Sequence, residues 1–149
     1  VFYPSGKLDK ERTFKNGKAN GPLKAFHENG NLKFEATLKD DQLVGTAKTY
    51  YESGALETEV NYENDKEEGI QKAHYESGAL KAEIHFHEGK WHGPSREYYE
   101  NGALRTEGEF VNGRGSEKRY YESGTLWENI TYEDQVQHGI TRLSANCAG

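Results

Sequence analysis

Six basic side chains recur at one fixed place in the sequence, each three residues after a glycine. They are Lys24, Lys48, Lys72, Arg96, Lys118 and Arg142. An acidic series keeps the same period and consists of Glu11, Glu35, Glu59, Glu83 and Glu107, with Asn129 in its last place. A row of cations would bind an anionic surface or polymer. We favour the alternative that the two rows face each other on neighbouring strands, where each opposite-charge pair contributes about 0.2–1 kcal/mol.

Pairs of adjacent aromatic residues recur with the same period. They are Phe26/His27, Tyr50/Tyr51, His74/Tyr75, Tyr98/Tyr99 and Tyr120/Tyr121. Adjacent strand residues point to opposite faces, so one member of each pair packs inside and the other forms an aromatic stripe. Such a stripe would suit a protein or sugar partner. Alternatively, both rows support a thin sheet by stacking. The sequence leaves both interpretations open.

A histidine cluster is the third candidate for chemistry. His85 and His87 are expected to share one strand face, with His92 close by, and two imidazoles could hold a metal. Because no other copy repeats them, we predict no metal site. The acidic turns, such as Asp40-Asp41, lack the alternating carboxylates of a calcium loop.

No catalytic centre is expected. Catalysis needs unlike groups that converge in a cleft, whereas equivalent glutamates here form regular rows. Ser5, Ser53, Ser77 and Ser123 are turn residues, and Cys147 stands near the end of the chain. The sequence therefore predicts that the protein is not an enzyme and has no cofactor.

The elements that carry these rows follow from two series of glycines. The first series is Gly6, Gly30, Gly54, Gly78, Gly102 and Gly124, and the second is Gly21, Gly45, Gly69, Gly93, Gly115 and Gly139. The spacing within each series is 24 residues, except for one step of 22. We attribute the short step to a loop that has lost two residues. This regularity defines six repeats.

Side chains between the glycines alternate with period two, which is typical of strands. Leu56, Thr58, Val60 and Tyr62 fall on one face. We expect Glu-Ser-Gly and Glu-Asn-Gly to form tight turns, and segments such as 63–69 to form longer ones. The prediction is an all-β, elongated, single-layer antiparallel meander of tandem β-hairpin repeats, because no connection is long enough for a parallel crossover.

The repeats define one domain over residues 1–149. Its approximate units are 2–25, 26–49, 50–73, 74–97, 98–119 and 120–143, followed by a tail at 144–149. The end copies look like caps, since Lys10 and Arg12 take places on the apolar face, and Ser144 and Ala145 replace an aromatic pair. Open edges would allow end-to-end association unless these caps blunt them.

Composition narrows the class of protein further. Aromatic residues make up 12% of the chain and the net charge is −6, which argues against a disordered chain and against nucleic acid as the partner. The chain starts at Val1 and contains no Met, so we expect its natural start to have been removed. Both a secreted or surface location and a cytoplasmic one stay open.

The units Tyr-Tyr-Glu-Ser-Gly-x-Leu and Gly-x-x-Lys-x-Tyr-Tyr resemble the bacterial variant of the MORN repeat. The resemblance covers residues 2–143. It implies a twisted sheet of hairpins, a role in protein interaction or at membranes, and no shared catalytic residues. Many bacterial members are described as antitoxin-like, and others are surface or secreted proteins. One departure is Asp65, which replaces the inner glycine of the long turn in the third copy.

We therefore predict a non-catalytic scaffold, antitoxin-like by resemblance, that binds another protein along one sheet face. The alternative is an extracellular or surface module that contacts carbohydrate or lipid. The expected contact residues are Tyr50, Tyr51, Lys72, Tyr75, Arg96, Tyr98, Tyr99, Lys118, Tyr120 and Tyr121.

Overall fold

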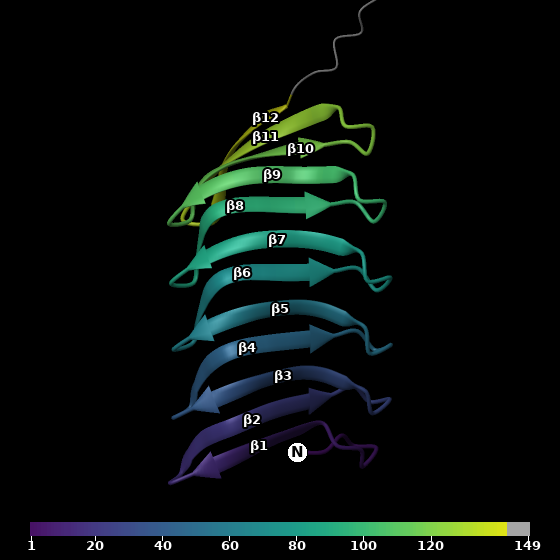
Figure 1. The fold of residues 1–149 in the computed structure, drawn as a ribbon, viewed down its shortest axis with the longest axis vertical. Coiled ribbons are helices and arrows are strands. Elements are labelled where there is room, and N and C mark those ends of the chain that lie inside the picture. Colours follow the sequence, from purple (N-terminus) through teal and green to yellow (C-terminus); the bar gives the residue numbers. More distant parts are fainter. Residues whose placement is uncertain (143–149) are drawn as a thin grey trace, which may run out of the picture.

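The computed structural model describes residues 1–142, which form one open sheet of twelve antiparallel strands in chain order (Figure 1). The strands are β1 (Lys10–Lys15), β2 (Lys18–Phe26), β3 (Leu32–Lys39), β4 (Gln42–Tyr50), β5 (Leu56–Glu63), β6 (Lys66–His74), β7 (Leu80–His87), β8 (Lys90–Tyr98), β9 (Leu104–Val111), β10 (Arg114–Tyr120), β11 (Leu126–Glu133) and β12 (Val136–Arg142). The predicted all-β meander is confirmed. Among the described residues there is no helix that could cross a membrane. Residues 144–149, with Ser144, Ala145 and Cys147, lie outside the described part.

The two kinds of connection have the opposite lengths to those we expected. The Glu-Ser-Gly and Glu-Asn-Gly segments lie in five-residue connections, such as residues 51–55 between β4 and β5. The segments expected to be long loops are instead strand joined by a two-residue turn. Asn64 and Asp65 form one of these turns, with φ values of 50° and 66°. Both residues thus take the left-handed conformation that a type I′ hairpin requires, so Asp65 keeps the turn without glycine.

The two-residue turns are also bonded to the preceding hairpin. The Asp65 amide donates to the Leu43 carbonyl at 3.1 Å, and the Leu43 amide donates to Asp65 Oδ1 at 2.7 Å. Asp41 makes the same two bonds with Ala19. These bonds offset the steric penalty of a left-handed non-glycine residue, which explains why aspartate serves at this position.

The faces of the sheet differ in chemistry. One, which we call the apolar face, carries all the buried side chains among the described residues. They are Ala19, Ala25, Ala36, Ala47, Val60, Ala82, Ser95, Thr106, Phe110, Glu117, Glu128 and Ile130. Strand register places Lys10 and Arg12 opposite Ala25 and Leu23, on this face at the exposed edge, as the cap prediction requires.

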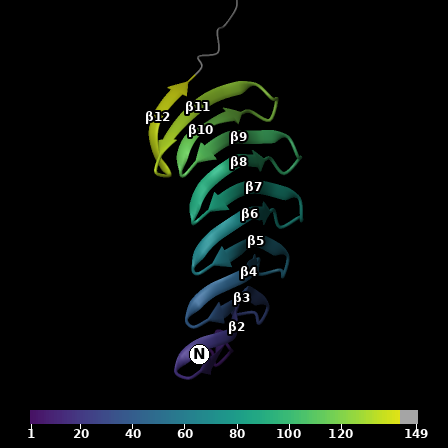
Figure 2. The ribbon, with the colours of Figure 1, turned by 60° about the vertical axis from the view of Figure 1, so that its left-hand side comes forward.

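The sheet is bowed and twisted, as the curved strands in Figure 1 and their progressive rotation in Figure 2 show. A single-layer sheet has no second layer to cover side chains. Near-complete burial then requires neighbouring strands to converge over a side chain, which happens on the concave side. We infer that the apolar face is concave, and small residues such as Ala36 and Ala47 fit its crowded centre.

The short repeat has lost a β-bulge and not part of a loop. Between β3 and β4, one residue on β3 faces three on β4, because Glu35 pairs with Lys48 and Thr37 with Val44. The β9–β10 pair has no such irregularity, and β10 has seven residues where β8 has nine. The turn at 112–113 keeps its two residues. Our attribution of the lost residues to a loop was therefore wrong.

Candidate interaction surface

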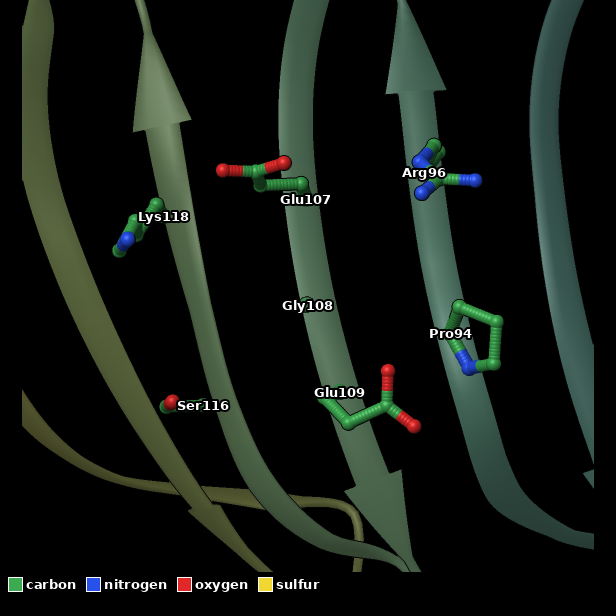
Figure 3. Close-up of a pocket in the computed structure, with 7 residues that line it drawn as sticks. All are labelled: Pro94, Arg96, Glu107, Gly108, Glu109, Ser116 and Lys118. Carbon is green, nitrogen blue, oxygen red and sulfur yellow. The ribbon is translucent and has the colours of Figure 1, made fainter.

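The second face carries a row of alternating charges that crosses ten strands. Register places each basic residue from Lys24 to Arg96 directly opposite glutamates on both neighbouring strands, as for Lys48 between Glu35 and Glu59. The row, which we call the charge ladder, runs Glu11, Lys24, Glu35, Lys48, Glu59, Lys72, Glu83, Arg96, Glu107, Lys118, and ends at Asn129. We call this side of the sheet the ladder face. Figure 3 shows Arg96, Glu107 and Lys118 side by side on β8, β9 and β10.

The basic series ends one hairpin earlier than we expected. Arg142 was expected to complete it, but its backbone pairs with Glu128, and Asn129 pairs with Thr141. The β11–β12 pair contains a smaller irregularity than the earlier hairpins, which changes the register at that end. Arg142 therefore falls outside the ladder.

Most ladder charges are aligned without being tightly paired. Within residues 1–142, the structure records one ladder ion pair, between Lys72 Nζ and Glu83 Oε1 at 3.9 Å, with both side chains partly exposed. At such a distance near water the pair contributes little. The cations Lys24, Lys48, Arg96 and Lys118 are thus accessible to a partner, and Arg96 and Lys118 are exposed.

Tyrosine hydroxyls take up two of the ladder carboxylates. Tyr50 Oη donates to Glu35 Oε1 at 2.6 Å, and Tyr120 Oη donates to Glu107 Oε1 at 2.6 Å. Burial and the Glu35 hydrogen bond raise the pKa of Tyr50 to about 12. The Glu107 hydrogen bond and burial raise the pKa of Tyr120. The first tyrosines of these pairs therefore lie on the ladder face beside the basic residues.

The second tyrosine of three pairs binds the next hairpin. The hydroxyls of Tyr51, Tyr75 and Tyr99 donate to the carbonyls of His74, Tyr98 and Tyr120, each at 2.8 Å. This bond recurs in three successive repeats, so these three tyrosines hold the array together. Tyr121 differs, with 54% of its surface exposed and its ring 5.7 Å from that of Trp127.

The histidine cluster forms polar pairs. His87 Nδ1 lies 3.0 Å from Glu68 Oε1, and His92 Nδ1 lies 3.2 Å from Asn112 Oδ1. The Glu68 hydrogen bond raises the pKa of His87. His85 shares the ladder face with His87 by alternation along β7. Among residues 1–142, no three His, Cys, Asp or Glu side chains are arranged to hold a metal ion.

A shallow hollow of about 300 Å³ lies on the ladder face at β8–β10 (Figure 3). It is lined by Pro94, Arg96, Glu107, Gly108, Glu109, Ser116 and Lys118. The hollow is open to solvent and carries two cations and two anions, so it does not select ions of one sign. Its position at the repeat without a bulge could have been located from the 22-residue spacing, but Glu109 and Ser116 recur in no other copy.

Comparison of the sequence with protein-family models identifies the repeat that builds this sheet. The model described as the MORN repeat variant matches residues 1–16, 19–40, 43–64, 67–88, 91–112 and 114–134. The chain belongs to the MORN repeat variant family. No curated protein matches the chain. MORN repeats generally mediate membrane or protein interactions and are generally non-catalytic.

The boundaries of the MORN matches fall at the two-residue turns, so each complete match pairs an even-numbered strand with the odd-numbered strand after it. Our units begin at the aromatic pairs instead. The bonds of Tyr51, Tyr75 and Tyr99 run from a five-residue connection to the last residue of the next even-numbered strand. The aspartate bonds link a two-residue turn to the start of the preceding even-numbered strand. Successive MORN hairpins are thus connected along both long edges of the sheet.

One polar cluster on the apolar face was not foreseen. Arg119 contacts Glu117 at 2.7 Å and Glu128 at 3.3 Å, and Tyr132 Oη donates to Glu117 at 2.9 Å. Burial and the Glu117 hydrogen bond raise the pKa of Tyr132 to about 12. Glu117 occupies the place that Ala47 and Gln71 hold in other MORN copies. A charged residue at this place was the only sequence signal. Because the cluster is buried and bonded internally, we assign it to stability.

Proposed function

We propose that this protein is a non-catalytic MORN-repeat scaffold that binds another protein along its ladder face. The observation that carries the proposal is the charge ladder, in which ten side chains of alternating sign lie on a regular lattice with most cations unpaired. Alternating charge specifies the register of a partner more than it adds bulk attraction. A folded protein can present such a pattern at strand spacing.

The ladder chemistry favours a protein over a membrane or nucleic acid. Its ten charged positions comprise five glutamates and five basic residues, so the row has no net charge. The whole chain carries −6. Anionic lipid headgroups and phosphate backbones attract clusters of one sign.

Charge reversal on opposite faces provides the test. Lys72→Glu places three like charges in a row on the ladder face, whereas Lys10→Glu makes the same change on the apolar face at the exposed edge. A partner captured by the wild-type chain should bind Lys72→Glu at least tenfold more weakly and Lys10→Glu almost unchanged, by titration calorimetry. Equal affinity for both variants would exclude the ladder face.

Vesicles and glycans test the alternative module. Wild-type protein should not bind phosphatidylserine vesicles or a glycan array, and binding that Lys72→Glu abolishes would favour the lipid or carbohydrate function. An antitoxin-like role is one form of protein binding. Its support is the resemblance to variant repeats described as antitoxin-like, and its test is whether the captured partner is toxic when expressed alone.

Removal of whole repeats tests the scaffold itself. Deletion of residues 50–97 removes two 24-residue copies and joins Thr49 to Tyr98, which precedes a tyrosine as Tyr50 does. We expect the shortened array to keep its β-sheet circular dichroism, because each repeat contacts only its neighbours. Affinity for the partner should fall with the lost ladder positions. Complete loss of structure would contradict the modular scaffold.

A further inference from the structure

We propose that the ladder face binds a second copy of this chain, back to back, about a twofold axis that runs parallel to the strands between β5 and β6. This inference rests on the proposed function, because it names the partner of the same face. It follows from the order of charges in the ladder, the state of its cations and one exposed apolar side chain beside the axis.

The charge ladder is complementary to its own reverse. It has ten charged positions, begins with Glu11 and ends with Lys118, and its sign changes at every strand. A twofold axis at its midpoint therefore places every acid opposite a base. The pairs are Glu11 with Lys118, Lys24 with Glu107, Glu35 with Arg96, Lys48 with Glu83, and Glu59 with Lys72, each occurring twice. An isologous interface requires this self-complementarity.

The free protein leaves these groups available for such contacts. Lys72 and Glu83 form the recorded ladder ion pair among residues 1–142, and at 3.9 Å it is loose. The hydroxyls of Tyr50 and Tyr120 hold Glu35 and Glu107 by one oxygen each, so the second oxygen of each carboxylate can accept a bond from the partner copy. The tyrosines also fix these two carboxylates in place, which lowers the entropy lost on binding.

Shape and apolar surface place the centre of the contact at β5 and β6. Because the apolar face is concave, the ladder follows the convex crest along the length of the array, and the twist seen in Figure 2 makes the two copies approach most closely at the strands near the axis. Ile70 on β6 lies on the ladder face two residues from Lys72, with 46% of its surface exposed. The axis brings Ile70 of each copy beside its symmetry mate, and so gives the charged contact an apolar centre.

Analytical ultracentrifugation of the purified chain tests the proposal without any other protein. The monomer has a mass of 16.9 kDa, so the dimer has 2 × 16.9 = 33.8 kDa. We expect a concentration-dependent dimer at about 0.1 M salt. It should weaken at least tenfold at about 1 M salt, where the Debye length falls from about 10 Å to about 3 Å. A chain that stays monomeric up to about 1 mM, the concentration at which even a 4 kcal/mol contact dimerises, overturns the proposal.

Two complementary reversals give the sharper test. Lys72→Glu and Glu59→Lys each place like charges at both contacts nearest the axis, so each variant alone should lose at least tenfold in dimer affinity. Mixing the two restores opposite charges across the axis, and we expect a heterodimer of wild-type affinity. Lys10→Glu, on the other face, is the matched control. A mixture that stays monomeric, or a dimer unaffected by either reversal, refutes the twofold ladder.

The outcomes separate this inference from the proposed function. A monomeric chain that still loses a different protein partner on Lys72→Glu would refute self-association and leave the scaffold intact. Ile70→Ser should weaken the dimer further, because it removes the apolar centre while leaving every ladder charge in place. A dimer that is insensitive to Ile70→Ser but sensitive to charge reversal would place the axis elsewhere along the ladder, which contradicts the proposed position.

Discussion

Ile130 and Ile70 offer the same side chain in opposite environments. Ile130 on β11 is fully buried on the apolar face, whereas Ile70 is 46% exposed on the ladder face. Ile130→Ala removes roughly three buried carbons, and at about 0.8 kcal/mol for each the transfer term is about 2.4 kcal/mol. Since the sheet has one layer, water can reach the gap and little cavity term is added. We expect a loss of about 2–3 kcal/mol, near the lower end for buried isoleucine.

Urea unfolding followed by intrinsic fluorescence measures this loss, with Ile70→Ala as the control. Ile70→Ala should destabilise by about 1 kcal/mol or less, because half of its side chain is already hydrated. Hydrogen exchange adds the location: amides of β10–β11 should exchange faster in Ile130→Ala while those of β3–β5 stay unchanged, as expected for nearest-neighbour stability. Equal losses from the two substitutions would show that the apolar face is not the core of this sheet.

Three further predictions address a backbone contact and two titrations. A Cβ at Gly115 would overlap backbone and ring atoms of β9, so Gly115→Ala should destabilise by about 1–3 kcal/mol in urea unfolding, and a neutral effect would disprove the close contact. Tyr50 should ionise near pH 12 in spectrophotometric titration, and at lower pH in the Glu35→Gln variant. Since the pKa of Tyr50 is raised in the folded state, the stability that its protonated hydroxyl gives to the fold is complete below pH 10 and is lost as pH rises toward 12. The pKa of His87, measured by NMR, should fall in the Glu68→Gln variant. The stabilisation that the His87–Glu68 pair provides should be present below the ordinary histidine pKa and lost above the raised one. An unchanged His87 pKa in the variant would mean that the pair does not form in solution.

The sequence predicted the fold because two periodicities agree. The period-two alternation from Leu56 to Tyr62 indicated a strand, and the 24-residue glycine spacing indicated how the strands repeat. The connection lengths were misjudged because Glu63–Gly69 reads as a polar loop, whereas Asn64 and Asp65 form a type I′ turn and the flanking polar residues are strand. Composition could not separate exposed strand from loop in a sheet without a second layer.

The candidate surface was only partly predictable, for a related reason. Equal spacing placed Lys72 and Glu83 in register, so their opposition could be read from the sequence. The bonds of the Tyr51 and Tyr75 hydroxyls to the next hairpin could not be predicted from the sequence, because they depend on the twist that brings one connection over the next hairpin. The departure of Arg142 from the basic row likewise follows from the size of the β-bulge between β11 and β12, which no residue type in the sequence indicates.

The missing bulge in β10 shows how this array accommodates a change in length. Two residues are one full period of a strand, so their removal leaves Glu117 and Lys118 on the same sides of the sheet as Gln71 and Lys72 in an intact hairpin. Removal of one residue would move every later side chain of that strand to the opposite face of the sheet. Insertions and deletions within these strands are therefore expected in even numbers, and an engineer can shorten each earlier hairpin that carries a two-residue bulge without moving the remaining side chains to the other face.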